Sequence, residues 1–504
     1  MGASNLSEVL ALIKAAQQNN IAKAAGFTGP TNAVQGINEY DLEPGARLLV
    51  PVTKLLRDMI PRDVGGMGIQ ANWRSITAVN PGGTNPGVSD GQRGGSIDQT
   101  VTNNLAAFAH LSLENFVTFD ADLAAKGFDN VRALAVQDLL WSFFEAEERT
   151  ILGGNPSLSL GTGNTPTGTP STTGGTLAAG TTYSVIVVPL TYDGMVWSTF
   201  PTITGSGAAA VPSGGAVKLP YTRNNADGTT DTINGFAGQK SSASSAITTT
   251  GTTGSIAVSC AATVGAMGYA WFVGATAGTE KLNQITGAPS ATITALNSTG
   301  QLASAGFASD LSTNSLVYAG LLTQILTSGS GAYVQDLGGA VLTSNGSGFG
   351  GISQIDTALL AFYNTHRLVP THIFMNGVDQ VNAGHKILNG NTNLAPFFMG
   401  GAQGDLGAGA QFTRYRNPVG YGNQVLEVVA HPFLPQGTIL FYSARNPYPL
   451  SNVAQVLKMK LQRDYYQTEW PVITRKYTYA VSCDGVLQCY FPPAFGCITG
   501  VGNG

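Results

Sequence analysis

The stretch Phe119–Asn155, FDADLAAKGFDNVRALAVQDLLWSFFEAEERTILGGN, predicts one long helix around which the rest of the chain is organised. From Asn130 to Leu152 it contains neither glycine nor proline, enough for a helix of roughly 35 Å at about 1.5 Å per residue. We expect Asp129 to cap its start and Gly153–Gly154 to end it in left-handed geometry. Apolar residues occupy nearly all sides of this helix, which is typical of burial on more than one face.

The charged side chains of this stretch gather near its end, at Glu145, Glu147, Glu148 and Arg149. Glu145 and Arg149 stand four residues apart, in the order that favours an ion pair on a helix. Glu147 and Glu148 instead lie at the negative end of the helix dipole, which disfavours carboxylates. We therefore expect a cationic partner for these two side chains, from this chain or from another subunit.

Composition narrows the class of protein. At 504 residues the chain is too long for a single core, so we expect about two or three domains. Only 11% of the residues are charged, against about 25% in an average soluble protein. A surface so poor in charge indicates extensive burial against copies of the same chain, because the cores of interfaces are depleted of charge.

Several classes of function find no support in the sequence. The net charge of −4 and the lack of a basic cluster interleaved with aromatic residues argue against nucleic-acid recognition. No apolar run reaches the roughly 18 residues of a membrane span, and the N-terminal segment lacks the order of a signal peptide. The five histidines form no HExxH pair, and neither a Gly-x-Ser-x-Gly elbow nor a Walker A loop occurs. We therefore predict no enzyme.

Two patterns could suggest a bound group or a covalent link. The motif G-x-G-x-x-G at 346–351 precedes a predicted helix, as in a dinucleotide-binding loop, but the next strand ends without the acidic residue that such a site needs. Cys483 and Cys489 flank Asp484–Gly485, which favours a two-residue hairpin turn that keeps the sulfurs too far apart to bond. The other two cysteines lack zinc-ligand spacing. The sequence thus predicts no cofactor, metal or disulfide.

Residues 61–118 predict a long hairpin. MGIQANWRSITAV (67–79) and QTVTNNLAAFAHLSLENF (99–116) read as extended segments. Between them, Asn80–Gly95 is rich in turn residues and has no periodicity.

Residues 156–309 differ in composition from the rest of the chain, because Ser, Thr, Gly and Ala dominate and charged residues are few. Extended runs at 181–199, 255–262, 268–276 and 291–296 predict a small β-sandwich, with a turn at Asp193–Gly194 dividing the first run. It would be an insertion after the long helix, where chain ends lie close together. A low-complexity linker is the alternative, and the aromatic residues of these runs argue against it.

From residue 310 the sequence again predicts a mixture of helices and strands. Helices are predicted at 310–326 and 351–368, and a strand followed by a helix at 370–388. The remainder reads as strands and turns, and it carries Arg463, Arg475 and Lys476. These three cations are our candidates for the partners of the glutamates at the end of the long helix.

The ending E-x-E-x-R-x-(apolar)-x-G-G at 145–154 resembles the end of the spine helix in HK97-type major capsid proteins of tailed bacteriophages. No single motif is specific, and the order of the segments carries the resemblance. It implies an α+β, HK97-like capsid fold with an inserted all-β, Ig-like or fibronectin-III-like sandwich. Its parts are an N-terminal arm (1–60), an E-loop hairpin (61–118), the spine helix of the P-domain (119–155), the inserted sandwich (156–309), an A-domain (310–440) and C-terminal P-domain strands (441–504).

By this resemblance, copies of the chain form hexamers and pentamers that close an icosahedral shell around double-stranded DNA, without sequence-specific DNA contacts. The implied partners are further copies of the chain, a portal protein and decoration proteins. Assembly would use a separate scaffold protein or none, and no membrane is involved. The implied place is the virion, after synthesis in the host cytoplasm. Trp73, Arg93 and Trp141 join the charged residues named above as candidate inter-subunit contacts. No lysine lies between Lys54 and Lys126, so we expect no lysine–asparagine cross-link from the hairpin.

Two other classes remain open. An encapsulin-like compartment shares the fold, but its chains are shorter and lack the insertion. A surface adhesin with Ig-like modules fits the middle third of the chain, but it has no use for a helix that is apolar on nearly all sides.

Overall fold

The computed structural model describes residues 51–502 with several gaps. The gaps are 81, 84, 127–128, 199–215, 226, 346–350, 390–396, 401–404, 409–411, 421–424, 447 and 449–450. The chain divides into two compact units, and the larger, 50–124 with 130–504, holds all the elements that follow. Most of the predicted arm at 1–60 and of the glycine motif at 346–351 lies outside the described residues.

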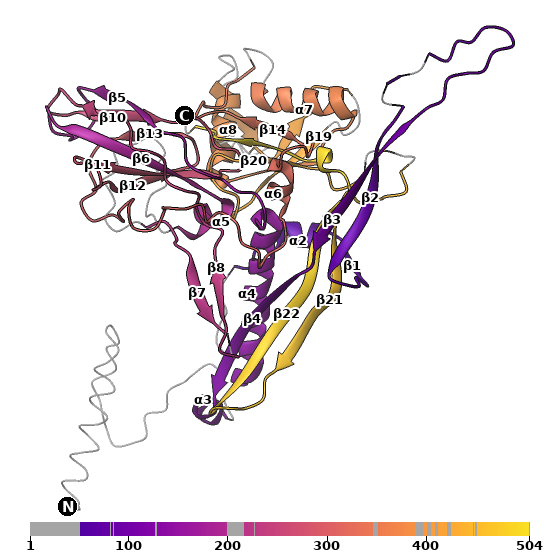
Figure 1. The fold of residues 1–504 in the computed structure, drawn as a ribbon, viewed down its shortest axis with the longest axis horizontal. Helices are drawn as coiled ribbons and strands as arrows, with labels where there is room; N and C mark the ends of the chain where they lie inside the picture. The colour runs from indigo at the N-terminus through magenta and orange to yellow at the C-terminus, as the bar shows by residue number, and fades with distance from the viewer. Residues whose placement is uncertain are drawn as a thin grey trace, which may run out of the picture. The chain divides into compact units, whose positions relative to one another are not determined.

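The predicted long helix is present as α4 (Val131–Gly153), and it lies along a four-stranded sheet (Figure 1). The strand order is β1-β21-β22-β4, with β1 parallel to β21 and the other pairs antiparallel. The strands are β1 (Arg62–Val64), β4 (Ala109–Thr118), β21 (Leu457–Glu469) and β22 (Lys476–Cys489). Phe143 of α4 is buried edge-on against Tyr465 of β21, with 5.7 Å between the ring centroids. The final strands therefore pack on the long helix, as the resemblance implies.

Both ends of α4 differ from the prediction. The N-cap is Asn130 rather than Asp129, and its side chain accepts a backbone N–H of the first turn at 3.1 Å. At the other end Gly154 has a φ of −51°, so the predicted left-handed ending is wrong. The glycines serve close packing instead, because a Cβ on Gly153 would lie 2.1 Å from the ring of Tyr192.

The predicted hairpin consists of β2 (Gln70–Val79) and β3 (Gln99–Ala107), which pair only with each other among the described strands. Figure 1 shows the hairpin running on beyond the end of the β4–β22 pair. A single residue, Phe108, separates β3 from β4. The short helices of this region are α2 (Leu55–Met59) and α3 (Phe119–Ala124).

The segment after α4 forms two antiparallel sheets, in the orders β13-β10-β5 and β12-β11-β6-β9, and a separate β7–β8 hairpin. The strands are β5 (Thr167–Ser171), β6 (Thr182–Leu190), β7 (Tyr221–Asn224), β8 (Thr230–Ile233), β9 (Ile247–Thr248), β10 (Ser255–Ser259), β11 (Gly268–Gly274), β12 (Lys281–Thr286) and β13 (Ser290–Ile293). Val185, Val187 and Trp271 of one sheet share a buried core with Ile256 and Val258 of the other. The segment is thus a β-sandwich, and its Ig-like identity stays a prediction.

The turn predicted at Asp193–Gly194 is wrong, because both residues lie in a helix, α5 (Tyr192–Trp197). The hydroxyl of Thr191 caps this helix by accepting the backbone N–H of Gly194 at 3.0 Å. The sandwich is also not separate from the rest of the unit. Tyr192 and Met267 belong to the same buried cluster as the residues of α4.

The remaining region contains a six-stranded mixed sheet in the order β14-β23-β20-β15-β19-β18. The helices and strands of this region, in and outside the sheet, are in chain order α6 (Leu321–Leu326), β14 (Tyr333–Asp336), α7 (Ser353–His366), β15 (His372–Met375), α8 (Gly377–Asn389), β16 (Phe397–Gly400), β17 (Asp405–Ala408), β18 (Arg414–Arg416), β19 (Val425–Ala430), β20 (Ile439–Tyr442), η1 (Pro492–Ala494) and β23 (Gly496–Thr499). Of the helix predicted at 310–326, only the last six residues are helical. One buried cluster joins this sheet to α4, and the predicted domain boundary at 440 falls inside β20.

The turn predicted at Asp484–Gly485 is also wrong, because both residues lie inside β22 and face partners in β21 and in β4. A strand paired on both sides overrides the local preference of this dipeptide for a turn. The four cysteines are free thiols. None of the helices in the described ranges is both long and apolar enough to cross a membrane.

Candidate functional site

The last turns of α4 carry two neighbouring glutamates that are almost completely buried. Glu147 is 1% exposed and Glu148 is 0% exposed. Glutamates are almost never buried to this degree unless they are paired. Successive residues on a helix point about 100° apart, so the two carboxylates face different elements of the fold.

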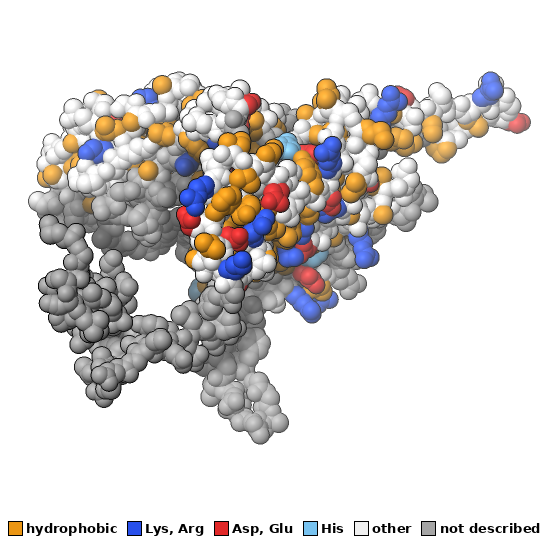
Figure 2. Space-filling view, turned by 90° about the horizontal axis from the view of Figure 1, so that it is seen from below, with side chains coloured by type: hydrophobic (Ala, Val, Ile, Leu, Met, Phe, Trp, Pro, Cys, Tyr) orange, Lys and Arg blue, Asp and Glu red, His pale blue; other side chains and the backbone are white. Residues whose placement is uncertain are grey.

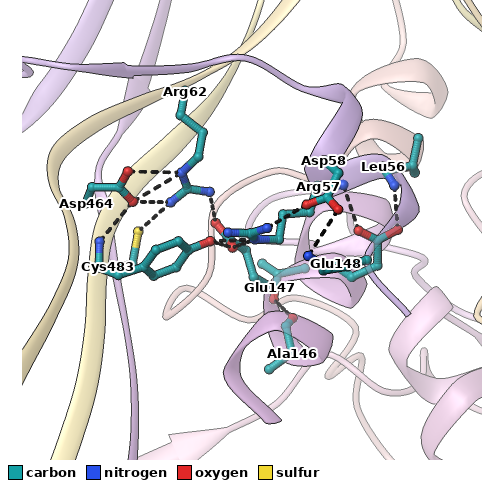
Figure 3. A network of polar contacts seen from close by, with 12 residues as sticks. Leu56, Arg57, Asp58, Arg62, Ala146, Glu147, Glu148, Asp464 and Cys483 are labelled. Carbon is teal, nitrogen blue, oxygen red and sulfur yellow. Dashed lines mark hydrogen bonds and ion pairs between the residues drawn. The ribbon is translucent and has the colours of Figure 1, made fainter. Parts of the chain in front are cut away.

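Glu147 faces two arginines and a tyrosine. Arg62 Nη1 donates to its Oε1 at 2.7 Å, and Arg57 Nε donates to its Oε2 at 3.2 Å. The hydroxyl of Tyr465 also donates to Oε2. Arg62 continues to Asp464, whose Oδ1 accepts from Nη2 at 2.6 Å. Figure 3 shows Arg62 bridging the two carboxylates.

The aromatic ring of Tyr465 lies between these charges. The guanidinium carbons of Arg62 and Arg57 are 4.3 Å and 5.1 Å from its centroid, within the range of cation–π attraction. Burial, followed by the charge of Glu147, raises the pKa of Tyr465, which keeps the hydroxyl a donor. Burial alone would lower the pKa of Arg62, but the hydrogen bond to Asp464 and the charge of Glu147 raise it.

Glu148 faces backbone donors and a histidine. Its Oε1 and Oε2 accept the backbone N–H groups of Leu56 and Arg57, each at 2.8 Å, at the start of α2. Nε2 of His431 lies 2.7 Å from Oε1. Because Nδ1 of His431 accepts the backbone N–H of Phe433 at 3.2 Å, we assign the proton to Nε2 and a neutral imidazole.

The two glutamates therefore join segments that are far apart in the sequence. Arg57 and Arg62 come from the chain before the hairpin, Tyr465 from β21, and His431 from the loop after β19. We call Arg57, Arg62, Glu147, Glu148, His431, Asp464 and Tyr465 the carboxylate clamp. Each carboxylate of the pair is fully engaged by donors, which makes the clamp a rigid structural joint.

The chemistry of the clamp gives no sign of a reactive group. Cys483 Sγ accepts from Arg62 Nη2 at 3.5 Å, but burial raises the pKa of this thiol to about 12, so it is protonated at neutral pH. In the part of the chain that the structure describes, no three His, Cys, Asp or Glu side chains gather where they could hold a metal ion.

The candidate cations of the C-terminal strands do not reach the glutamates, so that pairing hypothesis is wrong within a subunit. Arg475 pairs with Asp120 at 3.0 Å, and Lys476 lies over the ring of Phe116 at 4.7 Å. Arg463 is exposed and lies over Tyr466. For Arg475 and Lys476 the physical reason is strand direction. Lys476 opens β22 beside the end of β4, and this end of β22 contacts the start of α4, where Tyr479 meets Arg132.

The other residues predicted as inter-subunit or structural candidates lie apart from the carboxylate clamp. Glu145 and Arg149 form the predicted pair, although only at 4.0 Å. Trp73 donates its indole N–H to the carbonyl oxygen of Cys489 at 3.1 Å. Arg93 is exposed in the hairpin tip, and Trp141 is half-buried on α4. Their contacts with another subunit stay predictions.

The sequence analysis did not identify the partners of Glu147 and Glu148, which are Arg57, Arg62, Tyr465 and His431. One signal was available, because two arginines five residues apart are conspicuous in a chain with only 25 Lys and Arg among 504 residues. Nothing local in the sequence indicated the tyrosine or the histidine.

No protein-family model and no curated protein matches the sequence. The fold is similar to the capsid of a native GTA particle, at 8% identity over 95% of this chain and 98% of that one, with a TM-score of 0.38. It is also similar to the capsid of Myoviridae phage XM1, at 8% identity over 94% and 100%, with a TM-score of 0.39. The SrpI encapsulin of Synechococcus elongatus matches 37% of this chain and 57% of its own, at 12% identity and a TM-score of 0.22.

Proposed function

We propose that this chain is the major capsid protein of a tailed bacteriophage, whose copies join as hexamers and pentamers into an icosahedral shell around double-stranded DNA. The observation that carries the proposal is the apolar surface of the β2–β3 hairpin and its tip. Eight large apolar side chains on the hairpin, its tip and the connection before β2 are at least 45% exposed. They are Met67, Ile69, Ile76, Val79, Val88, Ile97, Val101 and Leu105. Figure 2 shows hydrophobic side chains along the hairpin.

A two-stranded hairpin without a core of its own is at best marginally stable in water. Its open edges and apolar side chains also invite contact with other chains. In a chain with only 11% charged residues, the simplest cover for this surface is another copy. Permanent interfaces of this kind bury about 2,000–5,000 Å².

The carboxylate clamp supports the same proposal. It fixes the start of the described chain, α4 and β21 to one another through hydrogen bonds to buried carboxylates. A subunit that must fit several neighbours repeatedly needs such a rigid body, from which the hairpin extends. The implied partners beyond further copies are a portal, scaffold or decoration proteins, and DNA held without sequence-specific contacts.

Electron microscopy of the purified chain tests the proposal. We expect closed shells of uniform size, and a sedimentation coefficient far above that of a monomer. Ile76→Glu and Leu105→Glu place charge on side chains that are 61% and 69% exposed, so the monomer still folds while shell yield falls at least tenfold. Val264→Glu, on the inserted sandwich at 71% exposure, is the matched control and leaves shell yield unchanged.

The contents of shells from the native source separate the alternatives. Double-stranded DNA inside supports the capsid proposal, and protein cargo inside points to an encapsulin-like compartment. A chain that stays monomeric under all assembly conditions would overturn both and favour the adhesin alternative.

A further inference from the structure

The β2–β3 hairpin is attached to the rest of the unit without a backbone ladder. In the described sheets β2 and β3 pair only with each other, and the main sheet consists of β1, β21, β22 and β4. Its position therefore depends on its two chain connections and on side-chain contacts.

The two connections lie next to each other and are short. On one side Gly68, with a φ of +75°, stands between Met67 and Ile69, which are each 86% exposed. On the other side Phe108 alone joins β3 to β4, and its backbone N–H donates to the carbonyl oxygen of Ile69 at 3.2 Å. A few exposed residues beside a glycine with a positive φ can absorb the backbone rotation of a hinge.

One face of the hairpin is turned toward the main sheet. Along β2 the residues Ala71, Trp73 and Ser75 are half-buried, whereas Asn72 and Arg74 are exposed. Since side chains alternate along a strand, the half-buried face is the one that meets the body.

Two side chains on that face donate hydrogen bonds to the main body of the unit. The indole N–H of Trp73 donates to the carbonyl oxygen of Cys489 at 3.1 Å, and the hydroxyl of Ser75 donates to that of Tyr490 at 2.9 Å. The pairing of β22 with β4 ends at Gly485, so these two carbonyls lie beyond the part of β22 that β4 covers. Both bonds run from a side chain to the backbone, and either can break without disturbing a strand ladder.

We propose that Trp73 and Ser75 form a releasable latch that sets the angle of the hairpin, and that Met67–Ile69 with Phe108 is the hinge about which it swings when the latch opens. The latch is a property of the unassembled chain. Its use, which is to let identical subunits meet neighbours at different angles, rests on the proposed function.

The test measures the hinge angle directly. Spin labels at Val101→Cys on the hairpin and Glu114→Cys on β4, both exposed positions, report one distance in the unassembled chain, with Cys260→Ser removing the one half-exposed native thiol. We expect a single narrow distance distribution in the parent. Trp73→Phe, which keeps an aromatic ring but removes the donor, and Ser75→Ala each add a second population. The double variant at least doubles the width of the distance distribution.

Arg74→Ala, on the opposite face of the same strand, is the matched control and leaves the distribution unchanged. Thermal melting verifies that each variant is folded, and if one single variant unfolds, the other decides. A double variant with the parent's distribution, or a parent already as broad as the double variant, would overturn the latch. Because these measurements need no shells, failure to assemble would refute the proposed function without touching this result.

Discussion

Glu147 is the side chain on which most of the carboxylate clamp depends. It is 1% exposed and it accepts hydrogen bonds from Arg57, Arg62 and Tyr465. Removing one member of a buried ion pair leaves the other charges without compensation, and this costs far more than the net contribution of the intact pair. The clamp is therefore easy to break by a single substitution.

We expect Glu147→Gln to lower the free energy of unfolding by about 3–5 kcal/mol. The half-buried Arg57 would then keep only the carboxylate of Asp58, and the half-buried Arg62 only that of Asp464. Urea unfolding of the unassembled chain measures this loss. Glu145→Gln is the matched control two residues away. Its carboxylate lies 4.0 Å from Arg149 and is partly exposed, so its loss costs about 1 kcal/mol or less. Equal effects of the two substitutions would contradict the assignment of the clamp.

Asp379 in α8 predicts a pH dependence. Burial raises its pKa from 3.8 to about 6, against the hydrogen bond that its Oδ2 accepts from the backbone N–H of Gly437. A carboxyl with a raised pKa holds its proton more tightly in the fold than in the unfolded chain. Its stabilising effect is thus complete below its ordinary pKa and is lost as pH rises through the folded value.

Relative to Asp379→Asn, the native chain should therefore lose about 3 kcal/mol of unfolding free energy between roughly pH 4 and pH 7. Unfolding free energies of both chains across this range provide the measurement. Taking the difference cancels the other carboxyl groups, which titrate in both chains. A difference that stays flat, or that rises with pH, would contradict the buried state of Asp379.

At the scale of elements, the end of α4 is shaped by its fit to α5. The ring of Tyr192 takes the place that a side chain on residue 153 would occupy. Tyr192 is 3% exposed and belongs to the main core. Close packing rather than backbone conformation therefore requires glycine at this position.

Gly153→Ala tests this requirement. Helix propensity alone would stabilise α4 by up to about 1 kcal/mol, but overpacking against Tyr192 costs about 1–3 kcal/mol, so we expect a net loss in thermal and urea unfolding. Ser142→Ala, an exposed position of the same helix, should instead gain a few tenths of a kcal/mol. In a double-mutant cycle the penalty should disappear on a Tyr192→Ala background.

How well the elements could be predicted depended on the range of the forces that form them. The extent of α4 follows from local propensity and was found to within one residue at each end. Asp193–Gly194 and Asp484–Gly485 carry the same local turn signal, yet one lies in a helix and the other in a strand paired on both sides. At Asp484–Gly485 strand pairing on both sides overrides the turn signal, because buried backbone groups must be hydrogen-bonded. At Asp193–Gly194 a short helix capped by Thr191 forms instead.

At the scale of the whole molecule, the inserted sandwich has two buried clusters of its own but also contributes residues to the main core. Its Tyr192 and Met267 are 3% and 2% exposed within that core. Losing a buried side chain of this size costs about 2–5 kcal/mol. Loss of both is comparable with the total stability of a protein, about 5–15 kcal/mol.

We therefore expect a chain without residues 156–309 to lose cooperative folding, as measured by thermal melting followed by circular dichroism. Deletion of the β7–β8 hairpin at 221–233 is the matched control, because its residues are largely exposed, and this shorter chain should melt as the parent does. A sandwich-deleted chain with a cooperative transition would show that the sandwich is an independent domain.

By itself, the sequence determined the long helix, the position of the hairpin, four strands of the sandwich (β6, β10, β11 and β13) and the scarcity of charge, because these depend on local periodicity and composition. Only the tertiary structure decided which cations meet the buried glutamates, why glycine ends α4, and how the hairpin is latched. Arg62 and Tyr465 lie 85 and 318 residues from Glu147. Contacts over such separations are set by strand order and direction, and no local pattern encodes them.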